Sequence, residues 1–585
     1  MKKIKLRNPL LVCASGLLFG ALPLWRGVAV SGDTLFHAMW YTNFSAQLLA
    51  GDAYPRWLMN LNGGLGSPAF FYYAPLPYYI TTLFTPLMSG GIHGMLHLGA
   101  SVALAIIASG LAAYLWLKEI AEREAAAATV AAVLYMLMPY HLAVDVYTRN
   151  AFAEVWAFVW MPLILYSVRR LACGDGAPKF APAGIALSYA ALIMTHLPTT
   201  LIFSLVPPCY AFFACAPQRR RRAVLITALG MLLGTGLASV YLLSAMLNQE
   251  FVSLADLLPD YYYQRWLRLT GFDLTLVEGR VTIAFLLTFG VIVCAYVLAR
   301  GSSGAANERA FKRERAFWMC VAAACVLLMT PLSDFVWRLV KPLRTIQFPW
   351  RFNTVLCVAA AALIAQAAGS LRRGRRKGAL RWAALVVGCV LVLGWVVFTV
   401  QVARREFPTL RRGSPAGMDA AYLKRLEHGR DAPEYRPANA ASTQAGDFEN
   451  LLSRICRDEG GRMARACAVE GTGTIKVERW QPREIGLRVE TESGMALNVS
   501  QFYYPGWAAY LDGGRHPLAP SAPDGLLHLT VPAGAHQVTL RLRHTAAEDA
   551  GIILSAASLV VLLIYLLTQK YFIGKRTIHS APPTV

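Results

Sequence analysis

A carboxylate stands where the chain leaves its first long apolar run, and this residue is the best placed for chemistry. The run extends from about residue 9 to residue 28 behind a basic leader, and Asp33 follows it closely. His37 comes four positions later, so the two side chains share a face if a helix begins there. A carboxylate in such a position can act as a base.

The segment after His37 combines acidic, arginine, glycine and aromatic residues. Residues 51–57 contain Asp52 and Arg56, residues 63–68 are rich in glycine, and residues 70–79 are largely aromatic. This mixture beside an apolar run suits a site for a charged, partly lipidic ligand. The alternative is an interfacial loop with an aromatic belt.

Further ionisable residues lie close to the ends of later apolar stretches. Asp145, Arg149 and Glu154 belong to one short segment, and Arg351 belongs to another. Ionisable groups at membrane depth are costly unless they are paired or hydrated. If these segments converge on one cavity, acids and arginines meet there; otherwise they are stray charges in separate loops.

Composition defines the class of protein. Hydrophobic residues make up 56% of the chain and charged residues only 15%, and apolar runs of spanning length recur throughout. This indicates a polytopic membrane protein and excludes a soluble fold. The net charge of +22 does not indicate nucleic acid, because much of the excess lies in short loops that alternate with nearly uncharged ones. The positive charge orients the chain and favours contact with anionic membrane lipids.

The distribution of basic loops predicts about twelve spans, with both termini on the cytoplasmic side. Prolines interrupt residues 70–89, so that stretch is expected as a half-embedded helix pair at the outer interface. We expect residues 1–401 to form the transmembrane domain and residues 402–550 an extracytoplasmic domain. Residues 551–585 are expected to hold the last span and a cytoplasmic tail.

The extracytoplasmic domain is predicted to contain a small antiparallel β-sandwich. Apolar side chains alternate with polar ones in residues 485–490, 527–531 and 538–543. The eleven cysteines show no zinc-type spacing. Cys456 and Cys467, which fall in this domain, form a disulfide if they meet an oxidant and otherwise remain two thiols. No Walker, Rossmann or GxSxG signature supports a nucleotide-driven pump or a serine hydrolase.

The order of short motifs along the chain resembles the GT-C superfamily of integral-membrane glycosyltransferases. The similarity is greatest to the YfhO-like branch and to the membrane proteins called 6-pyruvoyl-tetrahydropterin synthase-related. It covers residues 1–170 and 496–585 best. The motifs are Gly32-Asp33 with His37, Tyr54-Pro55-Arg56-Trp57, Gly66-x-Pro68 with Tyr72-x-x-Pro75-Leu76, Tyr147-x-Arg149 with Glu154, and Gln501-Phe502-Tyr503-Tyr504-Pro505-Gly506-Trp507.

The resemblance implies a polyprenyl-phosphate-linked sugar donor and an unidentified envelope glycan, lipid or protein as acceptor. Asp33 matches the family's first-loop acid, the base, and we expect His37 and Glu154 to support it. Asp145 is the alternative to Glu154 as the second acid. Arginines stabilise a leaving phosphate, and Arg56, Arg149 and Arg351 are the expected contacts.

The resemblance also places the chain in the inner (plasma) membrane of a bacterium, with its soluble domain outside. No Asp-x-Asp occurs in the second outer segment, so a divalent metal remains an open alternative and no cofactor is assigned.

Two other classes of function compete with the enzyme. A lipid or glycan transporter would use similar arginines, but it needs charged residues at mid-span that are gated from both faces. The third reading is a structural protein whose sandwich binds envelope glycans, although twelve spans exceed what an anchor needs.

Overall fold

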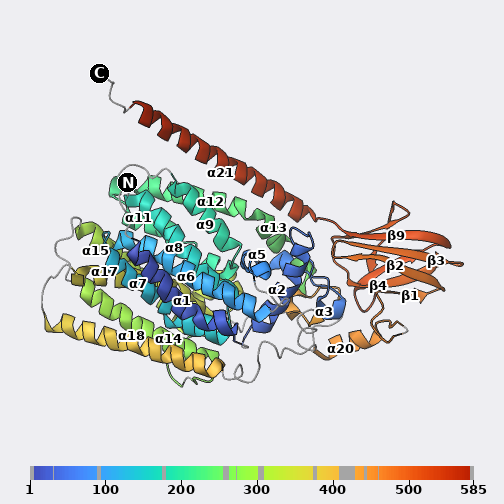
Figure 1. The fold of residues 1–585 in the computed structure, drawn as a ribbon, viewed down its shortest axis with the longest axis horizontal. Helices are drawn as coiled ribbons and strands as arrows, with labels where there is room; N and C mark the ends of the chain where they lie inside the picture. The colour runs from blue at the N-terminus through green and yellow to red at the C-terminus, as the bar shows by residue number, and fades with distance from the viewer. Residues whose placement is uncertain are drawn as a thin grey trace.

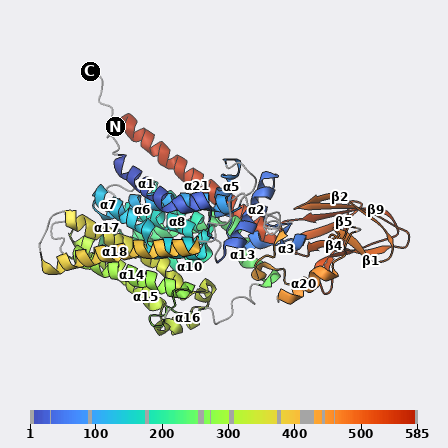
Figure 2. The same ribbon diagram turned by 60° about the horizontal axis from the view of Figure 1, so that its bottom comes forward.

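The computed structural model describes residues 6–29, 32–87, 94–173, 180–253, 263–271, 273–300, 308–372, 378–407, 428–440, 445–458 and 460–579. Long helices form a bundle, and a β-sandwich stands at one end of it (Figure 1). A group of short helices lies between the two parts. The same order is visible after rotation (Figure 2).

Apolar helices of spanning length make up the bundle. Within the described residues, nine segments are long and apolar enough to cross a membrane, or eleven if two bent helix pairs each count as a span. The apolar helix α9 (Ala181–Ile193) is shorter. The nine segments are α1 (Arg7–Arg26), α6 (Gly94–Ile120), α7 (Ala125–Leu137) with the π-helix η2 (Tyr140–Arg149), α8 (Phe152–Cys173), α10 (Leu197–Phe203) with α11 (Val206–Ala214), α14 (Val277–Ala299), η8 (Pro349–Phe352) with α17 (Asn353–Arg372), α18 (Ala379–Glu406) and α21 (Ala546–His579).

The two bent pairs are α12 (Arg220–Leu237) with α13 (Ser239–Leu247), and α15 (Glu308–Leu328) with α16 (Asp334–Leu339). The structure thus has nine to eleven candidate spans, against about twelve expected. The difference arises because a continuous apolar run in the sequence can fold as two helices with a sharp bend between them, here of 75° and 90°.

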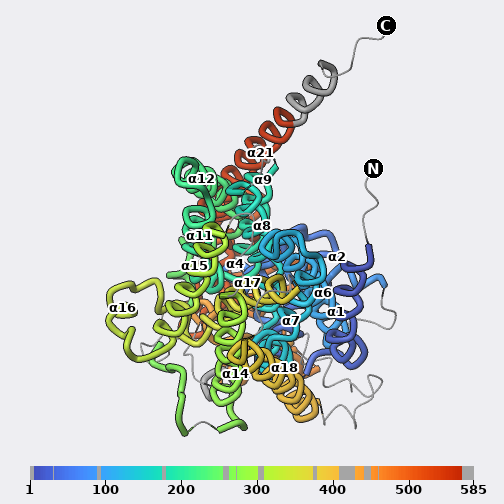
Figure 3. The backbone as a smooth tube through the Cα atoms, turned by 90° about the vertical axis from the view of Figure 1, so that its left-hand side faces the viewer, coloured from blue at the N-terminus to red at the C-terminus, as the bar shows by residue number. Residues whose placement is uncertain are grey.

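Helices α6, α8 and α17 are buried on most sides, whereas α18 and α21 expose apolar side chains along most of their length. Viewed along the bundle, α12 and α21 lie on one side and α14 and α18 on the opposite side (Figure 3). Small residues permit close helix contacts. A Cβ atom at Gly99 of α6 would lie 2.0 Å from the carbonyl oxygen of Pro23 in α1.

The segment between α1 and α6 forms short helices. They are α2 (Thr34–Leu49), α3 (Leu61–Gly64), α4 (Ala69–Tyr72) and α5 (Leu76–Thr82). Pro68 precedes α4, and Pro75 and Pro77 fall at the start of α5, where the missing N–H groups cost least. The prolines therefore divide this apolar stretch into short helices.

The sandwich consists of two antiparallel sheets. Their strand orders are β1-β4-β8-β7 and β2-β3-β9-β5-β6. The apolar residues predicted to face inward, including Leu487, Leu529 and Leu540, are buried between them. The strands are β1 (Ala466–Glu470), β2 (Gly473–Gln481), β3 (Glu484–Thr491), β4 (Met495–Phe502), β5 (Trp507–Leu511), β6 (Gly514–His516), β7 (Ala519–Pro520), β8 (Leu526–Val531) and β9 (Gly534–Leu542).

The sandwich is fixed to the short helices by hydrogen bonds. Trp57 Nε1 donates to Gln501 Oε1 at 2.8 Å, and Gln501 Nε2 donates to the carbonyl oxygen of Gly64 at 2.6 Å. Gly66 has φ +85°, and a Cβ atom there would lie 2.5 Å from the Trp57 ring. Two motifs far apart in the sequence therefore meet in one interface. Tyr504 is buried in it and offers no open stacking surface.

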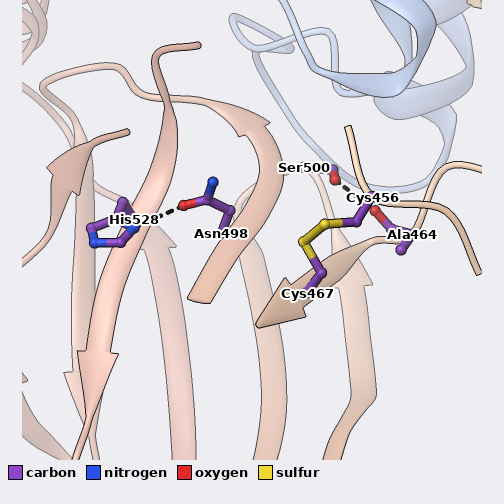
Figure 4. The surroundings of a disulfide bond; sticks show 6 residues. All are labelled: Cys456, Ala464, Cys467, Asn498, Ser500 and His528. Atoms are coloured by element: carbon purple, nitrogen blue, oxygen red, sulfur yellow. Dashed lines mark hydrogen bonds between the residues drawn. A yellow bond between two sulfur atoms is a disulfide. The ribbon is translucent and has the colours of Figure 1, made fainter. Parts of the chain in front are cut away.

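Cys456 and Cys467 form a disulfide that ties the segment after α20 (Ala445–Arg454) to strand β1 (Figure 4). Their Cα atoms are 6.3 Å apart, and their sequence separation is 11. Ser500 Oγ donates to the carbonyl oxygen of Ala464 at 2.6 Å inside the closed loop. The loop is thus held to β4 as well.

Replacing both Cys456 and Cys467 by serine is expected to lower the free energy of unfolding of the sandwich by about 2–3 kcal/mol in the chain-entropy picture. Chemical unfolding of the full-length protein in detergent, followed by hydrogen–deuterium exchange in strands β3 and β9, measures the change. Cys389→Ser, on the exposed side of α18, is the matched control. Equal stability of the double variant and the control contradicts the prediction.

Candidate functional site

Helix α7 continues beyond Pro139 as the π-helix η2, which carries Asp145 and Arg149. The side chains of all ten η2 residues are buried, although this part of the chain was expected as a short outer segment between apolar stretches. π-Helical turns are rare in proteins, and those that occur are often found at functional sites. Asn150 ends it in the left-handed conformation, with φ 48°. The expectation failed because the polar residues here pair with one another inside the bundle.

Glu154, at the start of α8, is the centre of a buried charge network. Arg149 Nη1 donates to Glu154 Oε2 at 3.0 Å and to Asp145 Oδ1 at 2.9 Å. Tyr140 and Thr354 hydroxyls donate to Glu154 Oε1 at 3.0 and 2.7 Å. Since its partners come from η2 and α17, this one carboxylate holds three helical segments together.

Arg351 joins the network from the other side. Its Nε lies 3.8 Å from Glu154 Oε2, and its Nη1 donates to the carbonyl oxygen of Ile346 at 2.6 Å. Arg351 also lies over the ring of Phe348, which stacks on Trp350, and Arg149 lies over Trp350. Stacked rings and carboxylate together hold both guanidinium groups in fixed positions.

Asp33 reaches this network through the backbone. Its N–H donates to the carbonyl oxygen of Arg149 at 3.3 Å. Gly32 has φ +50°, and a Cβ atom there would lie 2.5 Å from the same oxygen, so the close approach requires glycine. The Asp33 side chain itself is exposed. The structure therefore brings an accessible carboxylate within electrostatic range of two buried arginines, Arg149 and Arg351.

His37 lies one turn into α2, and its N–H donates to the Asp33 carbonyl oxygen at 3.1 Å. The imidazole is buried among aromatic rings, and its Nδ1 is 2.7 Å from the hydroxyl oxygen of Tyr78. Burial lowers the pKa of His37 to about 4, with Asp33 opposing and Arg149 adding to the shift. The ring is neutral at pH 7, so it can share a hydrogen bond but does not offer a positive charge.

A segment before the sandwich, residues 428–437, closes over α2. Trp40 Nε1 donates to Asp431 Oδ1 at 2.6 Å, and the Ser67 hydroxyl donates to Asp431 Oδ2. Burial raises the pKa of Asp431, and the hydrogen bonds oppose the shift. Asp431 thus fixes residues 428–437 to the short helices between α1 and α6.

Glu434 and Tyr435 follow in the same segment. The pKa of Glu434 is raised to about 7, mainly by burial, with the charges of Asp431 and Asp33 contributing and a backbone hydrogen bond opposing the shift. Tyr435 packs against Trp40 and Tyr73, with ring centroids 5.6 and 6.3 Å away. These residues were absent from the sequence-based candidates. The available signal was the rigid pair Pro433 and Pro437 around Glu-Tyr-Arg in an otherwise polar stretch.

Arg56 belongs to a different cluster. Its Nε lies 3.3 Å from Glu548 Oε1 at the start of α21, and its Nη2 donates to the carbonyl oxygen of Val240 at 2.8 Å. The guanidinium also lies over the Tyr54 ring. Arg56 therefore joins α13 and α21 to the short helices, and it has no contact with the Glu154 network. Because Arg56 is engaged with Glu548, our proposal for the phosphate contacts uses Arg149 and Arg351 and leaves Arg56 out.

The structure groups Asp33, His37, Asp145, Arg149, Glu154 and Arg351 at the end of the bundle nearest the sandwich. Among the described residues, no cluster of three or more His, Cys, Asp and Glu side chains is arranged to hold a metal ion. The arrangement instead offers an exposed acid, two fixed guanidinium groups and adjoining aromatic rings. It is suited to a phosphate-bearing ligand whose reacting atom lies next to the acid.

Comparisons with known proteins give one family. A family model described as "6-pyruvoyl-tetrahydropterin synthase related domain; membrane protein" matches residues 70–404. No curated protein matches the chain significantly.

The solved structures that are similar to this chain include three of low identity. The arabinofuranosyltransferase AftD from Mycobacteria has 13% identity and a TM-score of 0.48, covering 93% of this chain and 40% of its own. ArnT from Cupriavidus metallidurans, bound to undecaprenyl phosphate, has 16% identity and a TM-score of 0.39, covering 78% and 82%. The oligosaccharyltransferase AglB from Archaeoglobus fulgidus, in complex with an inhibitory peptide and a dolichol-phosphate, has 14% identity and a TM-score of 0.37. The match covers 68% of this chain and 55% of AglB. The chain thus spans about two fifths of AftD, and similarity of this degree does not assign an activity.

Glu434 makes the stability of the closed segment depend on pH. Its pKa is raised from 4.5 to about 7, so the folded state favours the protonated form. The stabilising effect is complete below pH 4.5 and is lost as the pH rises through about 7. We expect Glu434→Gln to remove this part of the fall in unfolding temperature, measured for the full-length protein between pH 4.5 and 8. The control is the exposed Glu492→Gln. An unchanged pH profile in the Glu434 variant contradicts the prediction.

Proposed function

The chain belongs to the family of 6-pyruvoyl-tetrahydropterin synthase related membrane proteins, and from this premise we propose that it is a GT-C type glycosyltransferase. It transfers a sugar from a polyprenyl-phosphate carrier to an envelope glycan, lipid or protein acceptor. The observation that carries the proposal is the exposed Asp33 carboxylate, which lies within electrostatic range of the buried Arg149 and Arg351 and whose backbone N–H donates to the Arg149 carbonyl oxygen. The family's motif-bearing first and second segments, distant in sequence, meet at this point.

Asp33 is the proposed base. In the reaction the acceptor hydroxyl attacks the anomeric carbon, the bond from that carbon to the carrier phosphate breaks, and the acceptor proton passes to a carboxylate. Asp33 is the exposed acid of the group, whereas Asp145 and Glu154 are buried and paired with Arg149. A single base with direct displacement inverts the anomeric centre.

Arg149 and Arg351 are the proposed contacts of the carrier phosphate. Negative charge grows on that phosphate as the sugar leaves, and prearranged guanidinium groups stabilise it without reorganisation. Glu154 acts as a positioning residue, because its oxygens already accept hydrogen bonds from Arg149, Tyr140 and Thr354. Asp145 positions Arg149 from the other side. His37 supports Asp33 through its backbone N–H, which donates to the Asp33 carbonyl oxygen, while its neutral ring shares a hydrogen bond with the Tyr78 hydroxyl.

Tyr73 and Tyr435 supply partly buried aromatic rings near His37 and Trp40, and we propose that their accessible parts pack against the sugar. The proposed location is the bacterial inner membrane with the sandwich outside. Two observations support this sidedness. Basic clusters such as residues 219–222 lie at the bundle end opposite the sandwich (Figure 1), and the sandwich holds the disulfide.

Asp33→Asn is expected to lower the transfer rate by about a hundredfold or more, because the base is lost while the shape of the side chain is kept. Transfer is measured in membranes supplied with labelled polyprenyl-phosphate sugar. Membrane insertion and detergent-extracted monodispersity should equal those of the unaltered protein, because the side chain is exposed. Unaltered transfer by this variant removes the central assignment.

Arg351→Gln is expected to lower kcat by about a hundredfold, the loss typical when one donor to a developing anion is removed. Retention of the polyprenyl-phosphate donor by the purified protein should also fall. The matched control is Arg338→Gln, since Arg338 forms an exposed pair with Asp334 in α16. If both variants retain donor equally and transfer equally fast, Arg351 only anchors the bundle.

A further inference from the structure

Arginines gather at the end of the bundle that lies opposite the sandwich. Helix α11 runs through the short helix η3 (Pro217–Arg219) into α12, which begins at Arg220. Arg313 comes from α15, which packs against α11. Arg219, Arg220 and Arg313 are all within electrostatic range of Cys215. Figure 3, seen from this end, shows α11, α12 and α15 side by side.

The nearby carboxylates are engaged elsewhere. Glu314, next to Arg313 in sequence, is paired with Arg169 at 2.5 Å and accepts a hydrogen bond from the Tyr210 hydroxyl. Glu308 pairs with Lys312 on the same helix. Neither Arg220 nor Arg313 forms an ion pair with a described residue. Within the part of the chain that the structure describes, the cluster therefore carries uncompensated positive charge.

Arg220 and Arg313 also have unused donors. The Nε atom of each is buried and has no hydrogen-bond partner among the described residues. A buried donor without an acceptor is unfavourable, so both groups gain from an added acceptor with several oxygens. A phosphate provides such oxygens and matches the planar fork of arginine.

An aromatic surface continues from the cluster. The Arg220 guanidinium lies 4.7 Å from the centre of the Phe212 ring. Phe212 and Phe213 are each 43% exposed, and they belong to a helix that is apolar enough to span a membrane. The arginine guanidinium group lies next to exposed aromatic rings along a spanning helix. This arrangement matches a phospholipid, whose charged headgroup is followed by apolar acyl chains.

We propose that Arg219, Arg220 and Arg313 bind the phosphodiester headgroup of an anionic phospholipid, whose acyl chain lies along Phe212 and Phe213. Basic pockets between helices on the cytoplasmic side favour such headgroups. The site is separate from the Glu154 network, and it does not depend on the proposed glycosyl transfer. It anchors the junction of α11 and α12 to one leaflet.

Native mass spectrometry of the full-length protein tests the site. The protein is released from detergent after incubation with phosphatidylglycerol or with phosphatidylcholine, and the bound fraction is compared. The unaltered protein should retain phosphatidylglycerol preferentially. Arg220→Gln with Arg313→Gln should lower that retention about tenfold, whereas Arg300→Gln, an exposed arginine at the same end, should not change it.

The variant Arg220→Lys with Arg313→Lys keeps the positive charge and replaces the glutamine pair if that pair does not fold. Its retention of phosphatidylglycerol should lie between those of the unaltered protein and the glutamine pair, because lysine lacks the planar fork. Equal retention of the two lipids by the unaltered protein overturns the proposal. So does undiminished phosphatidylglycerol retention in the glutamine pair or, if that pair does not fold, in the lysine pair. An equal loss in Arg300→Gln shows a diffuse surface charge and overturns it as well.

Discussion

The buried carboxylate of Glu154 is the interaction on which the arrangement of the site depends. An ionised side chain inside a helical bundle is costly unless charge and hydrogen bonds compensate it. Glu154 obtains this compensation from Arg149, Arg351, Tyr140 and Thr354. Removing any partner leaves charge uncompensated, so the π-helix η2, helix α8 and the start of α17 are held in one relative position.

A second constraint joins this network to the sandwich. The Asp33 backbone N–H is hydrogen-bonded to the Arg149 carbonyl oxygen. Helix α2 follows, and its Trp40 donates a hydrogen bond to Asp431 in the segment before the sandwich. Gln501 and Trp57 complete the connection from the other side. The sandwich and the segment before it are therefore tied to the short helices that carry Asp33 and His37.

Hydropathy and alternation predicted most of the architecture. The spans and the inward residues of the strands follow from local patterns, as Leu487 and Leu540 show by their burial. Asp33 and His37 were expected on one face on the condition that a helix begins there, and the structure has that helix. These features depend on residues close together in the chain, which is why the sequence contains them.

The remaining features depend on contacts between distant residues. Arg56 and Arg351 are the same residue type near similar aromatic motifs, and only the position of Glu548 assigns Arg56 to a different cluster. The π-helical form of residues 140–149 follows from pairing inside the bundle, which periodicity does not reveal. Glu434 lies about 400 positions after Asp33 in the sequence. The local sequence around it offers two prolines, which indicate a rigid segment but not its position near Asp33.

The most direct measurement is a cryo-EM map of the full-length protein with a polyprenyl phosphate bound. The account predicts density for the phosphate in contact with the Arg149 and Arg351 guanidinium groups, and with the Asp33 carboxylate facing the side from which an acceptor arrives. Phosphate density at Arg56 and Glu548, or at the opposite end of the bundle with the Glu154 network unoccupied, would contradict it.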